Sequence, residues 1–209
     1  MLRPEAFPYK NVHLLISDQA AYMLKTGANP VEGLFPNLMH LTCLCHALSR
    51  LYEKIRASYL KIDKLVTYLE NVLVRSTRRI ALLENTARSK LVSFPVATRW
   101  ETWVRFCDCL FHNLGGIREF PEKIFNGDAA SIGHLMKWLN ESYVAGELSE
   151  ICAVQILPKY MEKLEKRNLS ISDQKKPVEQ LKTLLPDKFR EKLGCCLRKN
   201  PPLRRFCRI

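Results

Sequence analysis

The order of apolar and polar residues divides the chain into a short start with strand character and a long helical remainder. Residues 11–17 form a compact apolar run that polar residues follow at once, which predicts a buried strand, and residues 37–43 predict a second one. Between them, residues 19–25 favour a helix that Asp18 can cap and Gly27 ends. A strand, a helix and a strand in this order predict a βαβ unit.

After residue 45 the apolar residues recur at intervals of three and four, which is the spacing of an amphipathic helix. In residues 60–74, for example, Leu65, Leu69 and Val72 share one face. Residues 90–98 are predicted to be extended. Gly115 and Gly116 are predicted to end the helix of residues 100–114. The predicted helices cover residues 46–56, 60–74, 78–86, 100–114, 129–143, 148–167, 177–184 and 187–198. The fold class is therefore predicted to be mainly α, with a short α/β start.

The first 46 residues are too few to form a large sheet. The first 46 residues hold at most two or three strands, and a two-stranded sheet is marginal by itself. We therefore expect two regions, residues 1–46 and residues 47–209, and further strands upstream in a larger protein. The apolar stretches are too short to span a bilayer, and no apolar segment of a signal peptide follows the first residues. We expect no membrane association and no secretion.

Positive charge is concentrated in two parts of the chain. The formal net charge is +12, and the excess lies in residues 50–90 and residues 187–209. Two basic blocks are typical of a chain that binds a polyanion, because each neutralised phosphate releases counterions. A solvated surface or a frayed basic tail gives the same pattern. The candidate nucleic-acid contacts are Arg75, Arg78, Arg79, Arg198, Lys199, Arg204 and Arg205.

The eight cysteines occur mainly in tight pairs, such as Cys43 with Cys45. Without a signal peptide, this spacing favours reduced thiols in the nucleus or cytosol. Two clusters contain residue types that bind zinc, but neither has the paired spacing of a structural zinc site, so we predict no zinc. These clusters are His40, Cys43, Cys45 and His46, and Cys107, Cys109 and His112.

Three local patterns, in order, resemble the hAT superfamily of transposases. Asp18 stands at the end of a predicted strand and is followed by small residues and a methionine. Cys43 and His46 have the spacing of the family's C-x-x-H motif, and Arg99 and Trp100 follow a threonine as in its T-R-W signature. A weaker similarity to domesticated hAT-like proteins, those labelled by similarity to CGG triplet repeat-binding proteins, extends over most of the chain.

The resemblance implies a fold and a chemistry. Residues 1–46 would be part of an RNase H-like catalytic core, and residues 47–209 a helical insertion domain. In the family, three acids hold two Mg²⁺ ions for strand cleavage, and Asp18 matches the second of them. We find neither of the other two acids in this chain. We therefore expect Asp18 to be vestigial, a weak Mg²⁺ ligand at most, and the chain to be neither an enzyme nor dependent on a cofactor.

Several single residues have two interpretations. Asp18 is either a residual metal ligand or only a helix cap. Trp100 stacks on an unpaired base, or belongs with Trp103 to the core. Arg99 contacts phosphate, or pairs with a nearby acid, Glu101 or Asp108.

The function hypotheses follow from these alternatives. The first is a transposon-derived, catalytically incomplete, DNA-associated protein of the nucleus. The second is a helical protein-interaction module that forms a homo-oligomer or binds a full-length transposase-like partner. The third is a decayed transposase fragment without function. Salt-dependent binding to nucleic acid distinguishes the first hypothesis from the second.

Overall fold

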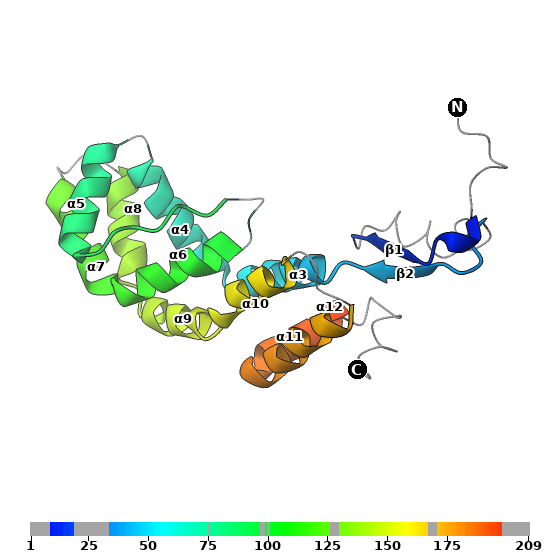
Figure 1. Cartoon of the computed structure of the whole chain (residues 1–209). Helices are drawn as coiled ribbons and strands as arrows, with labels where there is room; N and C mark the ends of the chain where they lie inside the picture. Colours follow the sequence, from blue (N-terminus) through cyan, green and yellow to red (C-terminus); the bar gives the residue numbers. More distant parts are fainter. Residues whose placement is uncertain are drawn as a thin grey trace, which may run out of the picture. The chain divides into compact units, whose positions relative to one another are not determined.

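The chain folds into two compact units, which Figure 1 shows as a computed structural model. Unit 1 is made of residues 1–51 and 160–209, and unit 2 of residues 52–159. The structure describes residues 9–18, 34–74, 76–96, 99, 101–125, 130–166 and 171–197. Helices dominate this part, beside one two-stranded sheet, which confirms the predicted fold class. No helix within it is both long and apolar enough to cross a membrane.

The sheet of unit 1 consists of two parallel strands. A 3-10 turn, Tyr9–Asn11, leads into β1, Leu14–Ser17, which pairs with β2, Met39–Thr42. Both predicted strands are confirmed, although each is shorter than predicted, and the prediction that the first is buried is wrong for Leu14 and Ile16. Parallel pairing is what a βαβ unit requires. The helix predicted for residues 19–25 lies outside the described residues, and the expected division of the chain at residue 46 stays a prediction.

Most apolar side chains on one face of this sheet are exposed, although Leu41, beside Ile16 on that face, is buried. Leu14 and Ile16 of β1 are 39% and 54% exposed, and Met39 of β2 is 37% exposed. On the opposite face, Ser17 and Thr42 are buried although they are polar. The described sheet therefore leaves apolar side chains accessible, which is unusual for parallel strands, since these are normally covered on both faces.

Helices complete unit 1. α3, Leu44–Arg56, follows β2 directly, and its residues up to Leu51 belong to this unit. The remaining helices come from the end of the chain: the last part of α10, Ile156–Leu164, then α11, Ile171–Leu184, and α12, Asp187–Leu197. The Tyr160 hydroxyl donates to Gln180 Oε1 at 3.3 Å, which ties α10 to α11.

Unit 2 is a bundle of helices in which α5 packs on α7, α4 and α7 on α8, and α6 on α9. Apolar residues three and four apart on α4 are fully buried, as their spacing predicts. Trp103 is also buried, so the core interpretation holds for that ring. The elements are α4 Leu60–Leu73, α5 Thr77–Ala87, α6 Glu101–His112, α7 Leu114–Ile124, α8 Ala130–Leu139 and α9 Tyr143–Cys152.

Polar contacts join the helices of unit 2. The Tyr59 hydroxyl donates to a carboxylate oxygen of Glu150 at 2.6 Å, which ties the start of α4 to α9. Arg56 Nε donates to Asp63 Oδ1 at 2.7 Å and closes the turn between α3 and α4. These bonds fix the ends of helices whose apolar faces already form the core.

The prediction that Gly115 and Gly116 end a helix is wrong. α6 ends at His112, and a further helix, α7, begins at Leu114 and contains both glycines. A Cβ built on Gly116 would lie 2.5 Å from the Cα of Ala87, at the end of α5. Gly116 therefore permits two helix backbones to approach closely, and this packing outweighs the low helix propensity of glycine.

Other helix boundaries also differ from the prediction. The single helix predicted for residues 148–167 is two helices, because turns at residues 153–155 separate α9 from α10. The helix predicted for residues 129–143 ends at Leu139. α11 begins at Ile171, six residues before Pro177, which lies inside the helix.

Candidate functional site

The carboxyl ends of β1 and β2 meet at one edge of the sheet, which we call the carboxyl edge and define by Asp18, Cys43, Cys45 and His46. The Cys43 N–H donates to the Ser17 carbonyl at 2.7 Å, so Asp18 and Cys43 each follow directly on the paired strands. Cys43 then precedes α3, and its carbonyl accepts the Ala47 N–H at 3.1 Å. In open sheets with parallel strands, ligands usually bind at this edge.

A second polar group lies on the sheet itself. Ser17 Oγ donates to the Asp18 carbonyl at 2.9 Å, and it lies 2.7 Å from His40 Nε2. Which of these two atoms donates depends on the tautomer of the imidazole. Thus His40 is held by Ser17 on the sheet. His40 is therefore not part of the carboxyl edge.

The described residues contain no group of three or more His, Cys, Asp or Glu arranged to hold a metal ion. In the second zinc-like cluster, Cys107 and Cys109 lie about 200° apart around α6, so their side chains leave the helix on different sides. Cys107 is buried, and His112 is exposed, with its ring nitrogen bonded to the Asp108 carbonyl at 2.9 Å. The role of Asp18 as a weak Mg²⁺ ligand stays a prediction.

The thiols at the carboxyl edge have strongly different acidities. The pKa of Cys43 is lowered to about 4, chiefly by a hydrogen bond from the Cys45 thiol. Partial burial opposes this shift. The His46 ring and the backbone N–H groups of His46 and Cys45 lower the pKa further. The pKa of Cys45 is raised, because its proton is bonded to Cys43, because it is partly buried, and because the Cys43 thiolate repels a second negative charge.

A contrasting set of thiols lies in unit 2. Burial raises the pKa of Cys107 well above its ordinary value. Burial and the neighbouring Asp108 carboxylate raise the pKa of Cys152 to about 12. Both thiols remain protonated at neutral pH, so only the carboxyl edge combines a thiolate with a second thiol among the residues just described.

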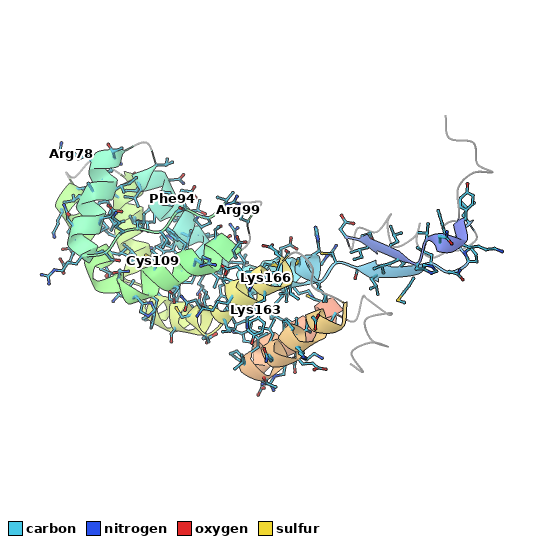
Figure 2. The ribbon with its side chains drawn as sticks, in the orientation of Figure 1. Arg78, Phe94, Arg99, Cys109, Lys163 and Lys166 are labelled. Carbon is cyan, nitrogen blue, oxygen red and sulfur yellow. The ribbon has the colours of Figure 1, made fainter. Side chains whose placement is uncertain are left out.

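The second candidate site is the exposed face of α5 in unit 2, which we call the basic face and define by Arg78, Ala81, Asn85 and Arg88. All four residues are exposed. Neither guanidinium has an ion pair or a hydrogen bond within the described part of the chain. Arg78 lies at the start of α5 (Figure 2), and Arg88 follows the end of it, about 15 Å away along the helix axis.

The acid of this helix is directed elsewhere. Glu84 Oε1 accepts the Leu91 N–H at 3.0 Å and fixes the extended segment after α5. Both guanidinium groups on the basic face are therefore available to an external anion, since neither has an ion-pair partner within the described residues.

Arg79 differs from its neighbour Arg78. Its Nη1 donates to the Val72 carbonyl at 2.9 Å, and its backbone N–H donates to the Ser76 hydroxyl at 3.3 Å, which caps α5. The side chain thus connects the end of α4 to the start of α5. A substitution of Arg79 changes the turn as well as the charge.

Arg88 has a backbone conformation that is rare for its residue type. Its φ is 53°, in the left-handed region, and its N–H donates to the Glu84 carbonyl. Glycine normally occupies this position after a helix because it has no Cβ. At Arg88 the left-handed conformation ends α5.

Of the three residues in the T-R-W pattern, Arg99 is the one that the structure describes. It is exposed, and within the described residues no ion pair joins it to Glu101 or Asp108. Its carbonyl accepts the Thr102 hydroxyl at 2.6 Å, and its N–H donates to the Val96 carbonyl at 2.9 Å, so a tight turn presents this side chain. The alternative of a local salt bridge is not what the structure shows.

Several of the predicted site residues cannot be compared with the structure. These residues lie outside the described part: Arg75, Trp100, Arg198, Lys199, Arg204 and Arg205. The structure brings together Asp18, Cys43 and His46 within unit 1. The predicted set does not include Arg88, although it lies ten residues from Arg78, about 80° around the helix axis.

Comparisons with known proteins do not extend this description. No family model, no curated protein and no solved structure matches the chain.

Proposed function

We propose that the chain is a nucleic-acid-binding protein of hAT transposase type that binds DNA without cutting it. The observation that carries this proposal is the basic face of α5, where Arg78 and Arg88 are exposed and free of acidic partners within the described residues. Guanidinium groups of this kind bind phosphate oxygens by charge-assisted hydrogen bonds.

The charge of the whole chain supports the same proposal. A net charge of +12 draws polyanions toward the protein from a distance, and counterion release then strengthens binding. The spacing of about 15 Å between the two arginines, measured along the helix axis, is comparable with the width of a DNA groove. Contacts to phosphates on both sides of a groove fix position and do not read sequence.

The transposase relationship remains part of the proposal. It is supported by the order of the three motifs and by the meeting of Asp18, Cys43 and His46 at one edge of a parallel sheet. Strand cleavage requires several carboxylates around two hard cations. If Asp18 is the only surviving acid of that set, Mg²⁺ or Mn²⁺ will not produce nicks in supercoiled DNA. Cleavage that Asp18→Ala abolishes would contradict this part of the proposal.

The test of binding is a salt series with fluorescent duplex DNA, read by anisotropy. Arg78→Ala and Arg88→Ala should each lower the slope of log Kobs against log salt by about 0.9, the value for one lost phosphate contact. Lys123→Ala is the matched control, because Lys123 already bonds to Thr86 at 3.4 Å and pairs with Glu119 at 3.6 Å. It removes the same charge from the same unit, and the slope should stay close to the original value.

A second candidate function is self-association through the sheet. The exposed apolar side chains of Leu14, Ile16 and Met39 favour it, since a second copy of the chain would cover them. Light scattering at increasing protein concentration tests this function. A dimer that Ile16→Lys dissociates would support it, and a monomer at every concentration would exclude it.

A further inference from the structure

The carboxyl edge of unit 1 contains two thiols and an imidazole, those of Cys43, Cys45 and His46, close together in sequence at the start of α3. We propose that Cys43 and Cys45 form a reversible dithiol–disulfide pair, in which Cys43 attacks a low-molecular-weight disulfide and Cys45 then closes the bond between them. This chemistry does not depend on nucleic-acid binding, and the residues that carry it belong to the other unit.

The geometry of the pair permits a disulfide. Two residues with one residue between them have Cα atoms at most about 7 Å apart, which overlaps the range of roughly 4.4–6.8 Å in disulfides. Cys43 precedes α3 and is not helical, so the 200° separation of two helical residues at this spacing does not apply to the pair. Both cysteines are half-buried, so a small reagent can reach them.

The surroundings distinguish the two sulfur atoms. Cys43 accepts hydrogen bonds from the Cys45 thiol, from the His46 ring and from the first N–H groups of α3, all of which stabilise a thiolate. Cys45 keeps its proton while that thiolate is beside it. Cys43 is therefore the attacking sulfur, and Cys45 is the resolving one.

The reaction is balanced as two exchanges. In the first, the Cys43 thiolate attacks the reagent disulfide, the reagent S–S bond breaks, and one reagent thiolate leaves. In the second, the Cys45 sulfur attacks Cys43 in the mixed disulfide, a second reagent sulfur leaves, and it takes the Cys45 proton. The protein pair loses two electrons and the reagent gains two.

The first exchange prepares the second. The main causes that raise the pKa of Cys45 are its bond to Cys43, partial burial and repulsion by the Cys43 thiolate. Once Cys43 is part of a mixed disulfide, its negative charge is gone, and the pKa of Cys45 falls toward its ordinary value. The resolving thiol is thus activated only after the attacking thiol has reacted.

Oxidised glutathione is a suitable probe for the full chain. Reduced protein is equilibrated with a series of oxidised-to-reduced glutathione ratios, quenched with an alkylating reagent and digested with trypsin. Cys43 and Cys45 fall in one tryptic peptide, residues 26–50, which holds no other cysteine. We expect this peptide to lose two hydrogens at a ratio that leaves the half-buried Cys109 mostly reduced.

Reciprocal variants assign the two roles. Cys45→Ser should trap glutathione on Cys43, whereas Cys43→Ser should trap roughly tenfold less on Cys45, and Cys109→Ser should behave like the original protein. The proposal would be overturned if glutathione were trapped chiefly on Cys45. It would also be overturned if the folded protein did not form the internal disulfide while the denatured chain formed it readily. Circular dichroism of each variant confirms that it is folded.

A pH series on the unaltered protein gives an independent test. Between pH 5 and 8, alkylation of an ordinary thiol slows about a thousandfold with falling pH, because the thiolate fraction falls tenfold per unit. Alkylation of Cys43 should change less than about threefold over the same range. A thousandfold change at Cys43 in the folded protein would show that no stabilised thiolate is present and would contradict the proposal.

Discussion

The two units use similar apolar sequences in different ways. In unit 2, Leu69 of α4 is fully buried, and the helices around it supply the core. In unit 1, Leu14 and Ile16 of β1 lie in an apolar run of the kind that predicts a buried strand, yet they are 39% and 54% exposed. An apolar run therefore predicts the element, whereas its burial depends on what covers it.

The two units also present different polar groups. The bundle of unit 2 buries its apolar faces among its own helices and presents arginines at its surface. The sheet of unit 1 positions Asp18 and the dithiol at its carboxyl edge. Parallel strands usually need other elements to cover both faces. The stability of the sheet therefore depends more on elements outside it than the stability of the bundle does.

The largest expected effect tests this difference with one substitution in each unit. Leu69→Ala should lower the free energy of unfolding by about 2–5 kcal/mol, because it leaves a cavity in the core of unit 2. Leu14→Ala should cost less than about 1 kcal/mol, because the side chain is already partly in water. Urea unfolding followed by circular dichroism measures both. Equal losses would show that Leu14 is buried in solution, and the contrast between the units would be lost.

An intermediate effect is expected at the close contact between α5 and α7. Gly116→Ala places a methyl group 2.5 Å from the Cα of Ala87 and should destabilise unit 2 by about 1–3 kcal/mol. Gly133→Ala in α8 is the control, since its added Cβ meets nothing within 4 Å, and it should stabilise by up to about 1 kcal/mol. Thermal unfolding distinguishes the two, and stabilisation by both would mean that the helices do not approach as closely as described.

The smallest effect links stability to binding at the basic face. Arg88→Gly should raise the free energy of unfolding by about 0.5–1 kcal/mol, because glycine tolerates the left-handed conformation. It should also weaken DNA binding, because a phosphate contact is lost. Arg88→Ala should weaken binding equally without the gain in stability. If the glycine variant bound DNA as tightly as the original protein, Arg88 would end the helix without contacting DNA.

Much of the architecture follows from the sequence. The strands at residues 11–17 and 37–43 and the change to helix after residue 45 are predicted by apolar spacing, and the structure has them. α7 was not predicted, because two glycines and Pro121 argue against a helix within eleven residues. Its apolar positions Leu114, Ile117 and Phe120 do have helical spacing, but only the contact with Ala87 explains why glycine is required there.

The candidate sites are predictable only in part. The position of Asp18 and Cys43 at one edge follows from two parallel strands, each of which ends directly before one of these residues. The contrast between Arg78 and Arg79 does not follow, since adjacent arginines look alike until one of them bonds to Val72. The acidity of Cys43 likewise depends on where α3 begins, which the sequence places within a few residues rather than at one.

The salt dependence of DNA binding by the double variant Arg78→Ala/Arg88→Ala tests the central proposal most directly. Each contact contributes about 0.9 to the slope of log Kobs against log salt, so the double variant should lose about 1.8 while Lys123→Ala loses almost nothing. That result would place the DNA backbone on the basic face of α5. An unchanged slope in the double variant, or no binding by the original protein even at low salt, would contradict the proposal.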